Sequence, residues 1–484
     1  MQPNQKRSTS HSSSSLESAK NGTNPYYYSG WQATVANYFK FDVLDTNFRT
    51  EILAGITTFM TMAYILVVNP LVLSDAIFLN QPRDLFSELV VATGVSAAIG
   101  TFIMAVYANY PFAQAPGMGL NAFFAYTVVL SLGIDWRLAL TAVFFEGLIF
   151  IGLTLTDIRR KMIAAIPFSL KNALSAGIGL FMAYIGLSGD PSDGGAGIIV
   201  ADEVTKTAFG SLRESTTLVA IVGFLITAAF VVRQVKGALL WGIFATALLG
   251  WITGVTAWPE GLFQVPEFPS HLFGQAIRGA EQINASNLID LVTVILVFLF
   301  VDIFDTLGSL TGVAMKAGFI DDRGELPRVN QALMADAVAT TSGAILGTSS
   351  VTSYVESAAG VMQGGRTGFA SVITAGLFVG SMLFIPLFQA IPFYATMPTL
   401  VIVGVLMMAN VVHINWQDLG EAIPAFLTIF MIPLTYSIAE GLSVGFIVYP
   451  LVKSFQGKGH EVSVATWILA AFFVARFLFM TLRF

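Results

Sequence analysis

The sequence predicts an all-α polytopic membrane protein with fourteen transmembrane segments in a 7+7 inverted repeat. Of its 484 residues, 55% are apolar and only 11% are charged, whereas soluble domains carry about 25% charged residues. Apolar runs close to the roughly 20 residues that a helix needs to cross a bilayer recur along the chain, and the alternating pattern of barrel strands does not. Sequence patterns of the first half also return in the second, which indicates duplication.

The apolar runs form two sets of seven expected spans. The first set covers residues 52–73, 86–107, 118–133, 137–156, 164–187, 215–232 and 237–257. The second set covers residues 288–313, 329–347, 353–364, 368–392, 397–412, 420–437 and 439–454. The third span of each set, residues 118–133 and 353–364, is too short to cross a bilayer alone.

Positive charge indicates how these spans are oriented. With the N terminus inside, the inner loops hold more cations than the outer loops, which agrees with the positive-inside rule. The inner cations are Arg159, Arg160, Lys161, Arg233, Lys236, Lys316, Arg323, Arg328, Arg366, Lys453 and Lys458. The outer cations are Arg83, Arg137, Lys206, Arg213 and Arg278. We therefore expect an integral plasma (inner) membrane protein with both termini in the cytoplasm.

The duplication divides the chain into five expected regions. In order, they are a disordered or interfacial cytoplasmic segment (1–45), the first repeat (46–257), an outer connection (258–287), the second repeat (288–454) and a C-terminal segment (455–484). Arg476 interrupts the last apolar run, 464–481. We therefore expect this helix to lie against the bundle or the membrane interface.

Two short patterns support duplication. The pattern Val91, Ala92, Thr93, Ala97, Gly100 and Thr101 returns with the same spacing as Val338, Ala339, Thr340, Ala344, Gly347 and Thr348. Downstream, Ala165–Phe168 returns as Ala390–Phe393. Because each copy holds an odd number of spans, the two copies cross the membrane in opposite orientations. This plan is typical of secondary transporters, which place their substrate at mid-membrane between broken helices.

The most informative residues are Asp302 and Asp305, which lie inside the eighth expected span. A carboxylate at the centre of a spanning helix costs roughly 2.5–3.5 kcal/mol on insertion scales, so such residues are functional by default. The spacing continues through Ser309, Gly312 and Lys316 at intervals of three and four residues, which favours one helix face. We expect this polar stripe to face a cavity.

Two segments are expected to be extended at first and then helical. Residues 111–121 hold two prolines and two glycines, and residues 347–356 are polar and β-branched before a run of small residues. Chain breaks of this kind stop a helix and expose the N terminus of the next one. Asn121 and Glu356 would lie at these two helix ends, which we expect to meet near the membrane midplane.

Together with Asp302 and Asp305, these two residues predict a site for a neutral planar molecule. Carboxylates accept N–H bonds, and an Asn side chain both accepts and donates. No matching ring of Lys or Arg favours an anion. Phe123 and Tyr354 are close enough in sequence to supply an aromatic wall. A buried carboxyl group can also carry a proton with the substrate, so proton symport is a hypothesis.

Other chemistry is not indicated by the sequence. The chain has no cysteine, so Cys-based metal or haem sites are excluded, and no cofactor is expected. A formal net charge of -6 offers no basic surface for nucleic acid. No catalytic triad, phosphate loop or zinc motif stands out, so we do not expect an enzyme. The isolated acids Glu146 and Asp336 are interpreted as structural.

Four motifs in order resemble those of the AzgA-like hypoxanthine/guanine/adenine permeases of the nucleobase–cation symporter (xanthine/uracil permease) superfamily. They are Phe48–Gly55, Ala115–Ala122, Val301–Gly308 and Thr352–Ser357. The resemblance covers about residues 48–454. It implies a fourteen-helix inverted repeat with a core domain and a gate domain, and short antiparallel strands in spans three and ten. It also implies proton-coupled uptake of adenine, guanine and hypoxanthine.

The resemblance also implies roles for individual residues. By motif position, Asn121, Asp302, Asp305 and Glu356 take the places of the family's substrate and coupling residues. Asp305 and Glu356 resemble direct purine ligands, and all three acids are candidates for proton coupling. Asp302 either sets the proton coupling or holds its helix. The expected partners are therefore a purine base, protons and membrane lipid.

Two other functions stay open at this point. A carrier for pyrimidine bases or xanthine would use the same fold, and an anion channel or exchanger could use the same scaffold. The anion function would require a cation at the binding end of a half-helix. The sequence does not rank the purines, does not separate proton from sodium coupling, and leaves the oligomeric state open, with a homodimer as one option.

Overall fold

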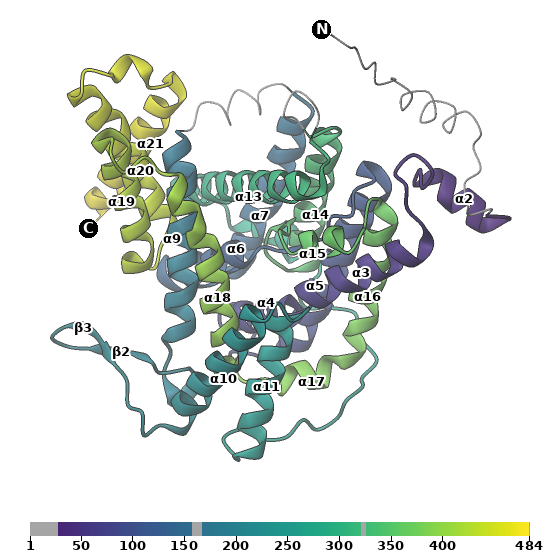
Figure 1. The fold of residues 1–484 in the computed structure, drawn as a ribbon. Helices are drawn as coiled ribbons and strands as arrows, with labels where there is room; N and C mark the ends of the chain where they lie inside the picture. Colours follow the sequence, from purple (N-terminus) through teal and green to yellow (C-terminus); the bar gives the residue numbers. More distant parts are fainter. Residues whose placement is uncertain (1–27, 157–166, 321–325, 484) are drawn as a thin grey trace, which may run out of the picture.

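The computed structural model describes residues 28–156, 167–320 and 326–483, and it is almost entirely helical (Figure 1). Three sequence expectations lie outside these described residues. They are the serine-rich tail before residue 28, the inner-loop cations Arg159, Arg160 and Lys161, and the inner-loop cation Arg323.

The first half of the chain holds α2 to α11 and the strands β1 to β3. The elements are α2 (Trp31–Tyr38), α3 (Phe48–Met62), α4 (Ile65–Ser74), α5 (Phe86–Ile103), β1 (Gln114–Pro116), α6 (Met118–Ala122), α7 (Trp136–Thr154), α9 (Phe168–Leu187), β2 (Ile199–Asp202), β3 (Lys206–Phe209), α10 (Ser215–Val232) and α11 (Ala238–Ile252). Two helices continue as π-helical turns: α5 through Met104–Ala108 and α6 through Phe123–Ser131.

The second half holds α12 to α21 and the strand β4. The elements are α12 (Gln275–Arg278), α13 (Leu288–Ala317), α14 (Val329–Leu346), β4 (Val351–Ser353), α15 (Ser357–Met362), α16 (Gly368–Ser381), α17 (Ile385–Gln389), α18 (Met397–Met408), α19 (Leu419–Thr435), α20 (Ile438–Phe455) and α21 (Val464–Arg483). A short 3₁₀ turn, Ala409–His413, extends α18.

Seven helices among the described residues are long and apolar enough to cross a membrane. They are Phe48–Ser74, Phe86–Ala108, Trp136–Thr154, Phe168–Leu187, Ser215–Val232, Gly368–Gln389 and Ile438–Phe455. Shorter apolar helices occur at Met118–Ser131, Ala238–Ile252, Met397–His413, Leu419–Thr435 and Val464–Leu478. This length and composition is that of an integral membrane protein.

The first expected span, 52–73, differs from the prediction because it is broken into α3 and α4. At the junction, Leu66 N donates to Ala63 O and Val67 N donates to Tyr64 O, both at 3.1 Å. These bonds connect residues three apart and tighten the chain as in a 3₁₀ turn. The break places Tyr64 on the inner side of the bundle, where the sequence pattern alone predicts an uninterrupted helix.

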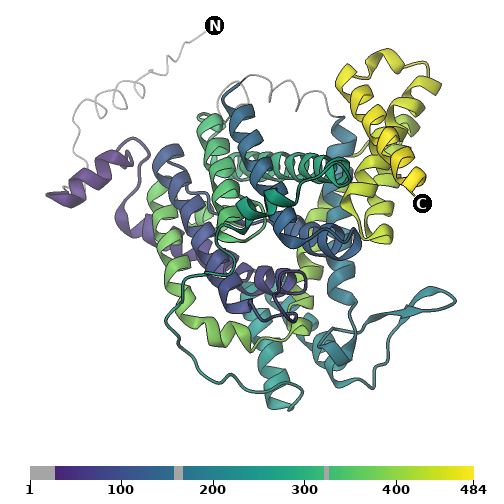
Figure 2. The ribbon, with the colours of Figure 1, turned by 180° about the vertical axis from the view of Figure 1, so that it is seen from behind.

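The helices pack in two groups (Figures 1 and 2). The first group comprises α3, α4, α5, α7, α13, α14, α15 and α16. The second group comprises α9, α10, α11, α18, α19 and α20, and α21 packs on α20. In both views α19 to α21 lie at one end of the molecule and α2 at the other.

The strands β1 and β4 pair antiparallel inside the first group, although more than 200 residues separate them. The paired residues are Gln114 with Ser353, Ala115 with Thr352, and Pro116 with Val351. Gly117 N donates to Ser350 O (2.9 Å) and Tyr354 N donates to Ala113 O (3.1 Å), which extends the pairing on both sides. The strand β1 lies just before the expected short span 118–133, and β4 ends at Ser353, the first residue of the expected span 353–364.

Each of these strands is also fixed to a helix by one threonine hydroxyl. Thr101 of α5 accepts from Gln114 N (2.9 Å) and donates to Gln114 O (3.0 Å). Thr340 of α14 accepts from Val351 N (3.1 Å) and donates to Val351 O (2.8 Å). The hydroxyls therefore satisfy the backbone groups that the two-stranded pairing leaves on its outer edges, as buried polar groups require.

One outer loop and the C-terminal helix contain features that the sequence did not predict in full. Residues 190–214, expected as a loop, contain the antiparallel hairpin β2–β3, which projects from the bundle in Figure 1. In α21, Arg476 is buried and forms an ion pair with Glu440 of α20, with 2.9 Å between Nη2 and Oε1. The cation that interrupts the apolar run thus has a half-buried acidic partner within the protein.

Glu51 connects α3 to the start of α16. Its carboxylate accepts from the hydroxyls of Thr46 and Thr367 (2.8 Å each). It also accepts from the backbone N–H groups of Arg366 (2.9 Å), Thr367 (3.3 Å) and Ala370 (3.2 Å). The first backbone N–H groups of a helix have no partner within the helix. Glu51 supplies that partner from outside α16.

We expect Glu51→Gln to lower the thermal unfolding midpoint of the detergent-purified protein. The amide nitrogen would face N–H donors, and each hydrogen bond to a charged group contributes about 1.5–3 kcal/mol. Arg49→Gln is the matched control, because Arg49 is exposed on the same helix. Equal midpoints for Glu51→Gln and the control would show that this carboxylate does not stabilise the fold.

Asp418 caps α19 and should make stability depend on pH in the acid range. The side chain of Gln456 donates to it (2.9 Å), as does Gly420 N (2.9 Å), and these bonds lower its pKa from 3.8 to about 2. A lowered pKa stabilises the fold fully above 3.8, and the contribution is lost as the pH falls toward about 2. Asp418→Asn should therefore unfold earlier than the wild type at neutral pH, by a margin that shrinks in acid. A margin independent of pH in thermal unfolding would contradict this.

Candidate functional site

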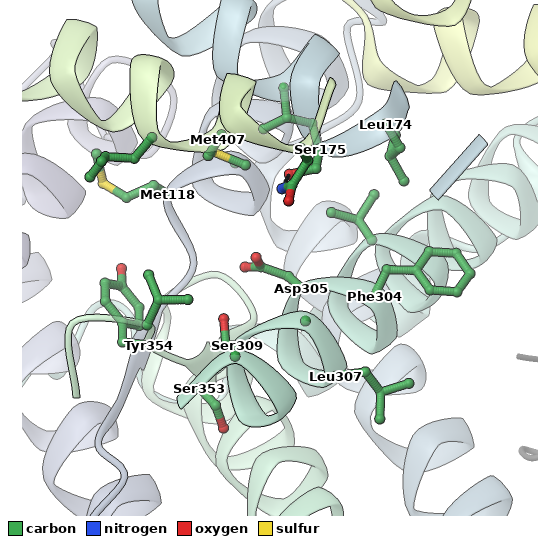
Figure 3. A pocket seen from close by; sticks show the side chains of 18 of the residues that line it. Met118, Leu174, Ser175, Phe304, Asp305, Leu307, Ser309, Ser353, Tyr354 and Met407 are labelled. Atoms are coloured by element: carbon green, nitrogen blue, oxygen red, sulfur yellow. Dashed lines mark hydrogen bonds between the residues drawn. The ribbon is translucent and has the colours of Figure 1, made fainter. Parts of the chain in front are cut away.

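A cavity of about 720 Å³ lies between the two groups of helices (Figure 3). Its walls come from α6, α9, α13, α18 and the segment that joins β4 to α15. The polar and aromatic lining comprises Tyr64, Phe168, Lys171, Asn172, Ser175, Phe304, Asp305, Ser309, Thr311, Ser353, Tyr354, Glu356 and Asn410. The size is within the range of about 300–1,000 Å³ that small-molecule pockets have.

Asp305 points from α13 into this cavity (Figure 3). Its Oδ2 accepts from Thr352 Oγ1 of β4 (3.3 Å). A carboxylate can accept about four hydrogen bonds, so Asp305 retains capacity for a ligand. Ser309 and Gly312, the next two residues of the predicted polar stripe, line the same cavity, as expected.

Glu356 reaches the cavity from the end of the segment that follows β4. Its Oε1 accepts from Tyr64 Oη (2.8 Å), and its backbone carbonyl accepts from Thr61 Oγ1 (3.3 Å). Glu356 precedes α15, as expected, but its side chain does not cap that helix. The N–H groups of Ser357, Ala358 and Ala359 instead form turn hydrogen bonds with residues 354–356. The free N–H groups expected at this helix end are therefore already used.

Tyr354 lines the cavity and also holds the strand crossing together. Its hydroxyl donates to Pro116 O (2.5 Å) across the β1–β4 pairing. Its ring carries the aromatic wall that the sequence predicted, together with Phe304 of α13. The same side chain thus links the position of both strands to the shape of the cavity.

Asn121 and Phe123 do not line the cavity, which corrects their expected placement. Asn121 is fully buried, and its Nδ2 donates to Asn69 Oδ1 of α4 (3.0 Å). The Phe123 ring packs against Phe298, with ring centroids 4.9 Å apart. Met118, Gly119 and Leu120 occupy the cavity wall instead. Successive residues of a helix point in different directions. A residue close in sequence to the cavity wall can therefore face a neighbouring helix instead of the cavity.

Asp302 is also absent from the cavity wall. It is fully buried on the opposite edge of α13, toward Glu146 of α7 and Thr340 of α14. Residues three apart on a helix are rotated by about 60° from one another. The edge of the cavity falls between Asp302 and Asp305. Asp302 and Asp305 thus have the predicted helical spacing, but Asp302 is buried against neighbouring helices, whereas Asp305 faces the cavity.

Several cavity residues were missed in the sequence, and Tyr64 and Lys171 are the clearest examples. Tyr64 is at the unpredicted break between α3 and α4, and no polar spacing pointed to it. Lys171 of α9 lines the cavity, with Nζ 5.4 Å from the centroid of the Phe304 ring. The sequence predicted no ring of Lys or Arg at the site, and among the described lining residues Lys171 is a single cation beside two carboxylates. The face of α9 that carries Lys171 also carries Ser175, whose Oγ accepts from Asn410 Nδ2 (2.8 Å).

The arrangement offers hydrogen-bond acceptors from two sides and apolar surface between them. Carboxylates of Asp305 and Glu356 can accept N–H bonds, while Phe304 and Tyr354 present rings. Within the described parts of the chain, no group of three or more His, Cys, Asp or Glu side chains could hold a metal ion. The geometry therefore suits a small polar heterocycle that carries N–H groups.

Comparisons with known proteins agree with this site. The model of the permease family matches residues 49–444. The guanine/hypoxanthine permease PbuO of Bacillus subtilis (strain 168) is 43% identical over 440 residues, covering 88% of this chain and 96% of PbuO. The adenine permease AdeP of Escherichia coli (strain K12) is 39% identical over 449 residues, covering 93% of this chain and 97% of AdeP.

A solved structure supports the fold. The transmembrane domain of the cyanobacterial bicarbonate transporter BicA matches with a TM-score of 0.56 at 16% identity, covering 83% of this chain and 98% of that domain. Identity at this level supports the architecture alone. The family match confirms the resemblance drawn from the four motifs, and it includes Tyr64, Asp305 and Glu356. The chain belongs to the permease family and is an integral membrane transporter of that fold.

Proposed function

We propose that this protein is a secondary active transporter that takes up purine nucleobases (adenine, guanine and hypoxanthine) with protons across the plasma membrane. The observation that carries the proposal is the pair of carboxylates, Asp305 and Glu356, that face one cavity between two groups of helices. The relatives named as guanine/hypoxanthine and adenine permeases support it.

The chemistry of a purine base fits this cavity. A purine is planar, presents N–H donors at its edge and apolar faces above and below. Asp305 and Glu356 would accept from the edge, and Phe304 and Tyr354 would contact the faces. Tyr64 would act as a positioning residue, because its hydroxyl already donates to Glu356. Asn121 and Phe123 would support the site from behind instead of touching the base.

The architecture in this proposal is the fourteen-span inverted repeat with the five regions predicted above. The antiparallel pairing of β1 with β4 supports it, because each strand leads into a short helix and the two helices start on opposite sides of one crossing. The first group of helices would be the core domain and the second group most of the gate. Movement of one group against the other would expose the cavity to each side in turn.

Proton coupling in this proposal rests on Asp302, Asp305 and Glu356. Intramembrane acids mark proton pathways in transporters. A carrier of pyrimidine bases or xanthine remains the alternative within the same fold. An anion channel or exchanger is disfavoured, because Asp305 and Glu356 both face the cavity and, among the described residues, Lys171 is the one cation that lines it. An anion would meet two carboxylates of its own sign.

Cells that lack their own purine carriers should accumulate radiolabelled adenine, guanine or hypoxanthine when they express this protein. A protonophore should collapse the accumulation, because the proton gradient would drive it. An excess of unlabelled uracil or xanthine should not compete. Uptake no higher than that of cells with an empty vector, for all three bases, would reject the proposal, and accumulation that ignores the protonophore would reject proton coupling.

Asp305→Asn and Glu356→Gln should each abolish concentrative uptake. Both amides replace an acceptor oxygen by a donor where the substrate N–H would lie. The loss of a hydrogen bond to a charged group is about 1.5–3 kcal/mol, or roughly 10- to 150-fold in transport efficiency. The measurement is initial uptake rate against substrate concentration, normalised to the amount of protein in the membrane.

The matched control for these variants is Glu203→Gln. Glu203 is an exposed carboxylate in the β2–β3 hairpin, away from the cavity. The Glu203→Gln variant should therefore transport purine bases like the wild type. Wild-type accumulation by both Asp305→Asn and Glu356→Gln would remove these two residues from the site.

A further inference from the structure

A second pair of acids lies behind the cavity, between α7 and α13. Glu146 and Asp302 are both fully buried, and their carboxyl groups lie within hydrogen-bonding reach of each other. Neither residue lines the cavity. The sequence interpretation of Glu146 as an isolated structural acid did not anticipate this partner, because it lies on another helix far along the chain.

The pair has fewer hydrogen-bond donors than its oxygens can accept. Ser350 Oγ donates to Glu146 Oε2 (2.8 Å). Among the described residues, Glu146 Oε1 and Asp302 Oδ1 have no donor. Thr340 Oγ1 lies 3.4 Å from Asp302 Oδ2, but it is closer to Val351 O (2.8 Å). A hydroxyl has one hydrogen, so the shorter bond commits it to Val351 and leaves Asp302 without a donor.

Asp336 on the adjacent helix α14 shows what a satisfied buried carboxylate looks like in the same protein. It accepts from Gln114 Nε2 (3.0 Å), Ser353 Oγ (3.2 Å) and Thr306 Oγ1 (2.8 Å). These three hydrogen-bond donors can stabilise the ionised carboxylate of Asp336. The contrast with Asp302 is therefore specific to that residue and is not a general feature of the buried acids here.

The charged groups that face the pair all have the same sign. Glu146 faces Asp302 and Asp336, and Asp302 faces Glu146 and Asp305. No cation is among the groups that the described residues place against them. Two carboxylates in contact repel each other when both are ionised, so the doubly ionised pair is high in energy, and a buried unpaired charge is costly. A proton on one of the two supplies the missing donor.

We propose that Glu146 and Asp302 share the proton that moves with the substrate, with Asp302 as its donor and Glu146 as its acceptor. This rests on the proposed transport function and assigns its proton site to a place that the substrate does not touch. On release, the O–H bond of Asp302 breaks and the proton leaves by way of Asp305, one helical turn away, to water in the cavity. Both acids of the pair are then ionised until the next proton arrives.

The pair is connected to the substrate site through the strand crossing. Ser350 donates to Glu146, and its carbonyl accepts from Gly117 N (2.9 Å). Thr340, next to Asp302, holds both backbone groups of Val351 in β4. Repulsion between two ionised acids would therefore act on the crossing that positions Tyr354 and Glu356. The occupancy of the proton site and the shape of the cavity are linked in this way.

Reconstitution in liposomes tests the proposal with Glu146→Gln, Asp302→Asn and the control Glu203→Gln. Both pair variants should still exchange internal for external purine base, because Asp305 and Glu356 are unchanged. Accumulation driven by a pH gradient should fall at least about fivefold, the lower end of an ordinary coupling factor. Proton entry on addition of the base should vanish. Gradient-driven accumulation equal to that of Glu203→Gln in both variants would overturn the proposal.

A second measurement does not depend on transport, and its first result comes from the wild-type protein alone. Infrared spectra of the purified wild-type protein at neutral pH should contain a protonated carboxylic acid band that shifts when aspartate is labelled with ¹³C. The band should be lost in Asp302→Asn and in Glu146→Gln. Absence of the band in the wild type, or stabilisation of the protein by sodium in its place, would overturn the shared proton. A wild type that shows the band but moves no purine would instead reject the proposed function and leave the pair intact.

Discussion

The antiparallel crossing of β1 and β4 is the interaction on which the site depends. Extended backbone inside a bilayer needs hydrogen-bond partners from the protein, because each unsatisfied group costs several kcal/mol. Here each strand satisfies the other, and Thr101 and Thr340 satisfy the outer edges. Gly117 makes the close approach possible, since a Cβ there would lie 2.5 Å from Thr352 Cγ2. A larger residue at this position would separate the strands and, with them, the two ends of the cavity wall.

The crossing also explains why the buried acids of the first group differ in character. Asp336 receives donors from both strands, through Gln114 of β1 and Ser353 of β4, so it acts as a fixed polar support. Asp305 receives one hydroxyl from β4 and otherwise faces open space. Asp302 receives no committed donor. In the proposed function, the same residue type would therefore serve structure, ligand contact and proton exchange according to how many donors surround it.

The positions of many helices could be predicted from the sequence, but the neighbours that each helix face contacts could not. The expected span at 215–232 coincides with α10 (Ser215–Val232), because an apolar run between polar ends defines a helix by composition alone. Asp305 could be predicted as a cavity residue because a carboxylate within an apolar run is costly unless it faces a polar space or a partner, and Glu356 because it ends a polar break before a short helix. Asp302 was expected at the same cavity from its spacing and Asn121 from its place at a helix end, but neither spacing nor a helix end determines which neighbour a helix face meets. Tyr64 and Lys171 were missed because the helix break and the packing of α9 against α13 are tertiary features.

The separation of Asp305 from the Glu146–Asp302 pair also bears on how symport can work. A carboxylate that accepts an N–H bond from a substrate loses that ability when it takes up a proton, because one oxygen becomes a donor. If Asp305 alone held the proton, proton and base would compete for the same oxygens. A carrier that moves both together needs them bound at the same time, and two carboxyl sites one helical turn apart meet that requirement. The connection through Ser350 and β4 then lets each site respond to the other without sharing a ligand atom.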